Sequence, residues 1–247
     1  MQTAWCMLGD PHLAERMGQA GFVAAVADLQ HGLLTCDQLS AFAASAESAN
    51  VAPLVRMPEG AFGDVGYAFD IGFEAVIFPM IETAEGARAL VAGGKYPPQG
   101  RRSYGPIRAL PNSGLSKSGY LADANGRHLV FAMVETARTL ENLNDIAATP
   151  GLDGLFVGPN DLAISLTGGE DTDPGAAEVT QALELVLSAC AANDLISGIY
   201  ANTLDLAFEF AARGFRLIAA GNDMTLLADA AGAMRAGFFN RLEGDKT

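Results

Sequence analysis

The sequence is poor in the residues that build disulfide frameworks and zinc sites. Its 247 residues include three cysteines, Cys6, Cys36 and Cys190, which lie far apart and outside any CxxC pattern. We therefore expect reduced thiols in a cytoplasmic protein rather than a disulfide-stabilised secreted domain. Histidine is equally rare, and no second histidine or cysteine stands at ligand spacing from His31. This disfavours a zinc site.

Positive charge and long apolar runs are also scarce. Lysine and arginine number 15 against 29 aspartates and glutamates, which gives a formal net charge of −14. Such a surface repels nucleic acid and anionic membranes, so neither is an expected partner. No apolar run approaches the roughly 20 residues of a membrane span, and no signal-peptide pattern opens the chain. These absences again favour a cytoplasmic protein.

What the sequence does contain is an alternation of short apolar runs with helix-compatible segments. Nearly continuous apolar character is typical of parallel strands that are covered on both faces. Eight such units in about 250 residues predict one (β/α)8 TIM-barrel domain, residues 1–247. The alternative is an open doubly wound sheet, which normally carries a GxGxxG turn that is missing here. The predicted strands cover residues 4–8, 22–29, 51–57, 74–80, 128–135, 153–158, 195–200 and 215–221.

One connection, residues 95–127, is much longer than the others. It carries six of the 15 basic residues and a single acid, Asp123. Loops of this length inside a domain usually have a function or form an interface. Two interpretations are equally open, a solvated subunit contact and an anion-binding lid.

Polar side chains stand at the ends of several predicted strands. His31 follows the second strand, Arg56 ends the third, Glu135 ends the fifth and Asp161 follows the sixth. In TIM barrels the carboxyl ends of the strands form one face, and this face carries the active site. We therefore expect these side chains to surround one pocket.

Glu135 and Asp161 suit a divalent cation of the Mg²⁺, Mn²⁺ or Co²⁺ type. Such an ion commonly takes one or two carboxylates and completes its shell with water and substrate oxygens. The alternative is that each acid caps the helix that follows it, Asp161 especially. Because the two acids stand at adjacent strand ends, the metal interpretation is favoured.

Arg56 and His31 add charge stabilisation and proton transfer. A buried arginine needs an anion, and its fork suits a carboxylate or a developing enolate oxygen. The alternative for Arg56 is an ion pair with Glu135 or Asp161. His31 can act as a base with Asp28, in the same turn, as its carboxylate partner. The alternative for His31 is a packed, hydrogen-bonded histidine.

Lysine is too rare to supply Schiff-base chemistry. Such chemistry on a ketone needs a lysine in the barrel mouth. The three lysines, Lys95, Lys117 and Lys246, fall in loops or in the tail. If this barrel acts on a keto acid, a metal must therefore take up the electrons.

Taken together, the motifs resemble those of the HpcH/HpaI aldolases, a family of metal-dependent pyruvate aldolases. The most specific signals are KYPPQGRRSYGP and GLFVGPNDLA, because a barrel alone hosts many functions. The resemblance covers nearly the whole chain. It is carried by ADLQHG (27–32), PLVRMP (53–58), FPMIETAEGARALVAGGKYPPQGRRSYGP (78–106), MVETARTLENL (133–143), DGLFVGPNDLAISLT (153–167) and, more loosely, GNDMTLLADAA (221–231).

The resemblance implies a role for each polar residue at the strand ends. Glu135 and Asp161 hold the ion, and pyruvate or hydroxypyruvate binds it through a carboxylate and the keto oxygen. Arg56 stabilises the enolate. His31 is the general base, and Asp70 raises its basicity. An aldehyde is the second substrate.

The resemblance also implies a substrate-binding turn and an assembly. The backbone amides of Asn160 and Asp161 hold the substrate carboxylate. Family members are typically hexamers, trimers of dimers, which exchange the last helix between neighbours. The apolar segment 224–239 agrees with this expectation.

Two positions depart from the family pattern. Gln30 stands where a glutamate often precedes the histidine, and Met133 stands where a glutamine often contacts the keto acid. Methionine cannot donate a strong hydrogen bond. We therefore expect a drier substrate pocket or an altered nucleophile preference.

Three functions are consistent with these residues. The first is a pyruvate-type aldolase. The second is an acyl-CoA lyase of the citrate-lyase β-subunit or malyl-CoA type, against which the His31 motif speaks. The third is a ligand-binding barrel without catalysis, against which the retained acids and Arg56 speak.

Overall fold

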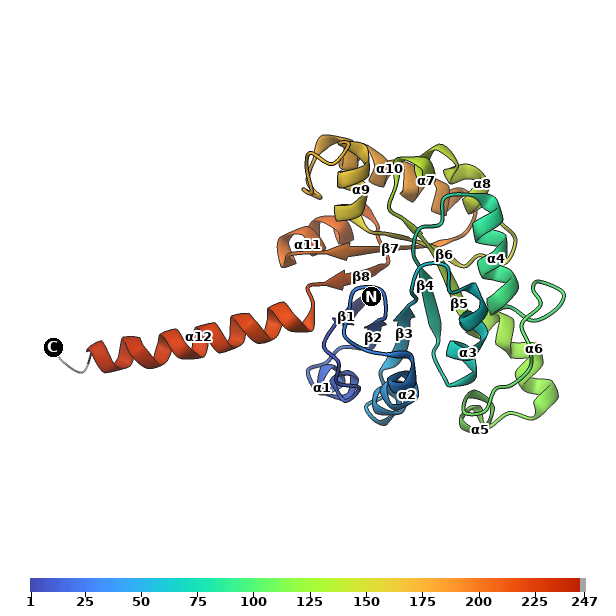
Figure 1. Ribbon diagram of the computed structural model, residues 1–247, viewed down its shortest axis with the longest axis horizontal. Helices are drawn as coiled ribbons and strands as arrows, with labels where there is room; N and C mark the ends of the chain where they lie inside the picture. Colours follow the sequence, from blue (N-terminus) through green and yellow to red (C-terminus); the bar gives the residue numbers. More distant parts are fainter. Residues whose placement is uncertain (245–247) are drawn as a thin grey trace.

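The computed structural model describes residues 1–244 and closes the eight predicted strands into one parallel barrel (Figure 1). The strands follow one another in chain order, and β1 pairs with β8 to complete the cylinder. The predicted (β/α)8 barrel is therefore confirmed, and the open-sheet alternative is excluded. The bounds are β1 (Gln2–Cys6), β2 (Ala24–Asp28), β3 (Ala52–Arg56), β4 (Ala75–Phe78), β5 (Leu129–Val134), β6 (Gly154–Val157), β7 (Ile196–Ala201) and β8 (Leu217–Ala220).

Helices surround the strands. The segment 137–147 forms two short helices that are divided at Asn142, and the long connection 95–127 contains two more. Short 3₁₀ turns precede α2 and α3, at Cys36–Gln38 and Phe62–Asp64. The helices are α1 (Leu13–Gln19), α2 (Leu39–Ser48), α3 (Val65–Asp70), α4 (Ala84–Gly94), α5 (Ala109–Ser113), α6 (Lys117–Arg127), α7 (Ala137–Glu141), α8 (Leu143–Ala147), α9 (Pro159–Leu166), α10 (Ala177–Ala192), α11 (Leu204–Arg213) and α12 (Asp223–Gly244).

Strand alternation fills the inside of the barrel. Every second residue points inward, and the inner cluster includes Val26, Leu54, Phe131 and Phe156. Large rings lie against glycines of the next strand. A Cβ at Gly154, for example, would come within 2.3 Å of the Phe131 ring. Continuing the same alternation to the carboxyl ends turns Asp28, Arg56 and Glu135 inward as well.

A second apolar layer joins the barrel to its helices. Outward-facing strand residues such as Val55 and Leu155 belong to one cluster with helical residues such as Phe69 and Leu90. Each fully buried side chain of this size contributes about 1.5–3 kcal/mol relative to exposure. This layer holds the strand ends in fixed positions, so the site they carry is rigidly mounted.

The last helix, α12, leaves the barrel and runs outward over 22 residues (Figure 1). Large apolar side chains along it are exposed: Met224, Leu226, Leu227, Met234, Phe238, Phe239 and Leu242. None of the helices within residues 1–244 has both the length and the apolar character to cross a membrane. Lys246 lies outside the described residues, and the single domain over residues 1–247 stays a prediction for the whole chain.

Candidate functional site

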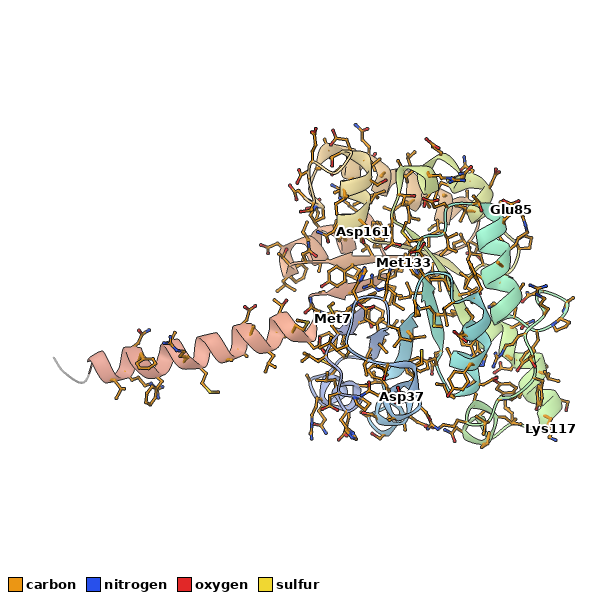
Figure 2. The ribbon with its side chains drawn as sticks, in the orientation of Figure 1. Met7, Asp37, Glu85, Lys117, Met133 and Asp161 are labelled. Carbon is orange, nitrogen blue, oxygen red and sulfur yellow. The ribbon has the colours of Figure 1, made fainter. Side chains whose placement is uncertain are left out.

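A hollow of about 190 Å³ opens at the carboxyl ends of the strands. Met7, Met133 and Asp161 lie around this mouth (Figure 2). The residues predicted from β2, β3 and the β6–α9 junction meet in it. Its lining consists of Trp5, Met7, His31, Arg56, Met133, Phe156, Gly158, Pro159, Asn160, Asp161 and Tyr200.

Arg56 is held on one side of this pocket by a clamp. Its Nε donates to Asp28 Oδ1 at 2.9 Å and its Nη2 to Asp28 Oδ2 at 2.5 Å. Trp5 Nε1 donates to the same carboxylate at 3.1 Å, and the guanidinium lies 5.1 Å from the Trp5 ring centroid. Burial alone would raise the pKa of Asp28, but the hydrogen bonds and charge of Arg56 hold it below its ordinary value. The clamp therefore favours the ionised form of Asp28 and fixes the direction of the guanidinium.

Asp28 thus has a different role from the one expected. The ion pair of Arg56 is with Asp28, so the alternative pairing with Glu135 or Asp161 is wrong. Asp28 also accepts the backbone N–H groups of Gln30 and His31, at 3.0 and 3.2 Å. It shapes the turn that carries His31 instead of binding the imidazole.

Glu135 is almost fully buried beside the mouth, with 1% of its surface exposed. Its Oε2 accepts the backbone N–H of Met80 at 2.9 Å. The pKa of Glu135 is raised to about 7, mainly by burial and in part by the charge of Asp161, while the Met80 N–H and the charge of Arg56 oppose the rise. The carboxyl group therefore lies within electrostatic reach of both residues in a poorly solvated place.

Two backbone features build the surroundings of Glu135. Met80 has a φ of +54°, a left-handed conformation that is rare for a residue with a side chain and that belongs to the loop aiming its N–H at the carboxylate. Gly158 lies against the other side. A Cβ at this position would come within 2.8 Å of Glu135 Oε1. The Glu135 side chain therefore occupies space that only glycine leaves open.

The chain after Gly158 begins α9, with Pro159 at its first position, where a missing N–H costs nothing. Leu162 N–H donates to the Gly158 carbonyl at 3.0 Å and starts the helical ladder. The amides of Asn160 and Asp161 come before this bond, and first-turn amides have no intrahelical acceptor. They suit an anionic group, and Asp161 stands among them with an exposed side chain.

The donor set fits a hard divalent cation. Glu135 and Asp161 come from neighbouring strand ends and are coupled in charge, and an ion of this type needs only one or two protein carboxylates. Within residues 1–244 no group of three or more histidines, cysteines and acids is gathered as metal ligands. An ion held by the pair would take its remaining ligands from water and substrate. A cation would also relieve the cost of ionising the buried Glu135.

His31 and Asp70 are not brought together within one chain. His31 is exposed at the pocket rim, whereas Asp70 ends α3 and accepts Arg102 Nη2 at 2.6 Å. Because α3 runs back from the carboxyl end of β3, its last residue lies toward the amino ends of the strands. Within residues 1–244 of one chain, His31 and Asp70 are therefore not in contact. The support of His31 by Asp70 stays a prediction.

The connection 95–127 does not reach this mouth, because the described pocket lining includes none of its residues. Two of its cations form buried ion pairs elsewhere. Lys95 is buried and pairs with Asp153 at 2.6 Å, and Arg102 pairs with Asp70. A lid over the mouth, one of the two expected roles, is therefore not formed by this chain.

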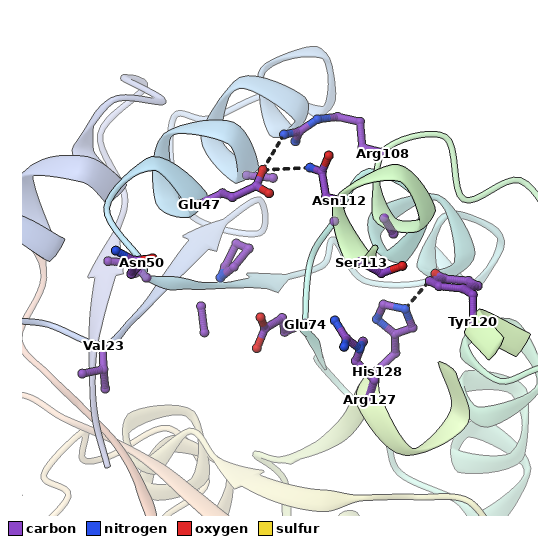
Figure 3. A pocket seen from close by; sticks show the side chains of 16 residues that line it. Val23, Glu47, Asn50, Glu74, Arg108, Asn112, Ser113, Tyr120, Arg127 and His128 are labelled. Atoms are coloured by element: carbon purple, nitrogen blue, oxygen red, sulfur yellow. Dashed lines mark hydrogen bonds and ion pairs between the residues drawn. The ribbon is translucent and has the colours of Figure 1, made fainter. Parts of the chain in front are cut away.

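Part of the same connection lines a second hollow of about 400 Å³ near the amino ends of β3 and β4 (Figure 3). Glu47 accepts Arg108 Nη2 and Asn112 Nδ2 there, each at 2.9 Å. Tyr120 and His128 close another wall, with Tyr120 Oη 2.9 Å from His128 Nε2. None of the residues predicted for catalysis lines this hollow.

Sequence reasoning missed two aromatic residues of the mouth. Trp5 and Tyr200 pack edge to face, with ring centroids 5.4 Å apart, and both line the pocket. Counting inward positions along β1 and β7 would have found them, since each occupies an inward position near the end of its strand. Trp5 is also the single tryptophan of the chain.

Comparison with known proteins agrees with the motifs. The family model described as HpcH/HpaI aldolase/citrate lyase matches residues 2–230. A hydroxypyruvate/pyruvate aldolase from Deinococcus radiodurans is 38% identical over 95% of this chain and 84% of its own. A 5-keto-4-deoxy-D-glucarate aldolase from Shigella dysenteriae is 32% identical over 92% and 87%. A solved HpcH/HpaI aldolase/citrate lyase family protein from Burkholderia cenocepacia matches with a TM-score of 0.87 and 31% identity, over 96% of this chain and 94% of its own.

Proposed function

The chain belongs to the HpcH/HpaI aldolase/citrate lyase family, and on this premise we propose that it is a metal-dependent aldolase acting on 4-hydroxy-2-oxo acids. Cleavage would give pyruvate or hydroxypyruvate and an aldehyde, and the reverse reaction would join them. Relatives named as hydroxypyruvate/pyruvate and sugar-acid aldolases support this carbon–carbon lyase activity. The observation that carries the proposal is the buried Glu135, electrostatically coupled to Asp161 and Arg56 at one barrel mouth.

Glu135 and Asp161 are the residues that would hold the divalent ion, with Mg²⁺, Mn²⁺ and Co²⁺ as the candidates. When bound, such an ion supplies positive charge where electrons accumulate as the carbon–carbon bond breaks. The amides of Asn160 and Asp161 would bind the substrate carboxylate. This role is supported by their place in the first turn of α9.

Arg56 would stabilise the negative charge that develops on the keto oxygen. A preorganised donor needs no reorientation during the reaction, which is why fixed hydrogen-bond donors are effective in catalysis. Asp28 and Trp5 provide this preorganisation. Asp28 engages two of the five guanidinium N–H donors through Nε and Nη2, and the others are available to the substrate.

His31 would remove the proton from the aldol hydroxyl during cleavage and return it during synthesis. Its exposure at the pocket rim allows contact with substrate and with water. Met133 would form an apolar floor under the keto acid, together with Phe156 and Tyr200. Such a lining excludes water and strengthens the nearby charge interactions.

We also propose that the protein assembles as a hexamer, a trimer of dimers, with α12 exchanged between neighbouring copies. The support is the row of exposed apolar side chains on a helix that extends away from its own barrel. Exposed apolar surface of this kind is typical of interaction sites.

The decisive experiment measures pyruvate release from a 4-hydroxy-2-oxo acid with added Mg²⁺, Mn²⁺ or Co²⁺ and again with a chelator. We expect turnover that the chelator abolishes and the ion restores. Turnover that depends on coenzyme A would indicate an acyl-CoA lyase instead. Absence of turnover across a panel of aldehydes, despite cation binding, would indicate a barrel without catalysis.

A further inference from the structure

The junction between β8 and α12 contains a buried acid that the proposed reaction does not use. Asp223, the first residue of α12, has only 2% of its surface exposed. Its Oδ1 accepts the N–H groups of Met7 and Met224, at 2.8 and 2.9 Å, and its Oδ2 accepts the N–H of Leu8 at 3.0 Å. Two of these three donors belong to the loop after β1, at the other end of the chain.

This loop forms part of the pocket wall. Met7 lines the mouth beside His31 and Trp5 and lies next to the start of α12 (Figure 2). A charged acceptor of two successive amides fixes the direction of the peptide planes more firmly than a single neutral hydrogen bond. Asp223 therefore fixes the position of the backbone at Met7 and Leu8, where the loop after β1 forms part of the pocket wall.

The contact continues to the turn that carries His31. The Met7 carbonyl accepts the N–H of Leu33 at 2.6 Å. A Cβ at Gly32, the residue after His31, would come within 3.1 Å of the same carbonyl oxygen. The Met7 peptide is thus held by Asp223 through its N–H and by the His31 turn through its carbonyl.

A parallel contact links the residue before Asp223 to another pocket residue, Tyr200. Asn222 Nδ2 donates to the hydroxyl of Tyr200 at 3.0 Å, while Asn222 Oδ1 accepts the N–H of Thr225 at 3.1 Å. Asn222 therefore caps α12 and holds a pocket aromatic at the same time. The first turn of α12 is bonded to the mouth at two separate points.

We infer that Asp223 is a positioning residue, which sets the place of the His31 turn by fixing the Met7 peptide between them. The inference rests on the proposed function for the role of His31. The placement of Trp5 and Met7 in the wall does not depend on that function. The pocket therefore has its correct shape only when the first turn of α12 is packed against the loop after β1.

The test compares Asp223→Asn with Asp229→Asn, which makes the same change at an exposed position of the same helix. Asparagine keeps one acceptor but turns an N–H group toward a backbone donor, so one of the two loop contacts is lost. We expect a roughly 10- to 100-fold loss of kcat in Asp223→Asn, as misplacement of catalytic groups by about 1 Å produces. Mn²⁺ affinity should stay unchanged, because Glu135 and Asp161 follow β5 and β6 and make none of these contacts, and the pH profile of kcat should shift. Asp229→Asn should behave as wild type in each measurement.

Fluorescence of the single tryptophan, Trp5, gives a readout that does not depend on catalysis. Asp223→Asn should alter its emission and its quenching by acrylamide, whereas Asp229→Asn should not. Altered Trp5 emission in a protein without aldolase turnover would support the inference and remove the proposed function. A folded Asp223→Asn protein with wild-type kcat and wild-type Trp5 quenching would overturn the inference.

If Asp223→Asn does not fold, hydrogen exchange of the wild-type protein tests the inference instead. The amides of Met7, Leu8 and Leu33 should exchange together with the first turn of α12, as one cooperative unit. Exchange of residues 223–226 without opening of residues 7–8 and 33 would overturn the inference.

Discussion

Replacing Glu135 by glutamine should stabilise the metal-free protein while it abolishes metal binding and activity. In the folded chain the pKa of Glu135 is about 7, against an ordinary value of 4.5, and burial is the main cause. The folded state therefore retains a proton that the unfolded state has released. Stability from this proton is fully present below pH 4.5 and is lost as the pH rises through about 7.

The expected gain in stability follows from the difference between the folded-state pKa of Glu135, about 7, and its ordinary value of 4.5. One pH unit corresponds to about 1.4 kcal/mol, so ionising Glu135 in the metal-free fold costs about 3 kcal/mol above pH 7. Glutamine keeps the shape and the acceptor for the Met80 N–H but carries no charge. Above pH 7 the metal-free Glu135→Gln protein should exceed wild type in its free energy of unfolding by up to this amount.

The assay is urea denaturation with a chelator at pH 5 and pH 8, at one fixed protein concentration because assembly affects apparent stability. The control is Glu141→Gln, an exposed glutamate at the end of α7. Isothermal titration with Mn²⁺ should show loss of binding only in Glu135→Gln. If wild type and Glu135→Gln lose the same stability between pH 5 and pH 8, the buried-charge explanation is refuted.

Three further substitutions test the remaining parts of the mouth. Asp28→Asn should lower the free energy of unfolding by about 3–5 kcal/mol, because it leaves the buried Arg56 unpaired; urea denaturation measures this, and a neutral effect would contradict the clamp. Arg56→Ala should reduce kcat in steady-state assays more than it reduces Mn²⁺ affinity, and normal turnover would rule out its role on the keto oxygen. Gly158→Ala should weaken Mn²⁺ binding in titrations, because its Cβ would come within 2.8 Å of Glu135 Oε1. Gly63→Ala is the control, because a Cβ there meets nothing within 4 Å. Equal Mn²⁺ affinity in the Gly158→Ala and Gly63→Ala proteins would show that the space beside Gly158 is not needed to hold Glu135.

The pattern of short apolar runs was sufficient for the fold and for the location of the site. Strand and helix periodicities are local properties, and eight repeated units leave few ways to close a sheet. Active sites of TIM barrels lie at the carboxyl ends of the strands, and this regularity placed His31, Arg56 and Asp161 at one mouth, with Glu135 beside it. Local patterns did not give the helix boundaries: the segment 137–147 is divided at Asn142, and the connection 95–127 contains two helices.

The sequence by itself therefore determined the barrel, the end of it that carries the chemistry and most of the polar residues there. Only the tertiary structure decided the partners, because a pairing depends on which side chains the closed cylinder brings within hydrogen-bond distance. Arg56 is bound by Asp28 and Asp70 by Arg102, although other acids and bases were available. The bond from the Met7 amide to Asp223 spans 216 residues, and no local pattern encodes a contact that exists only once β8 has closed against β1.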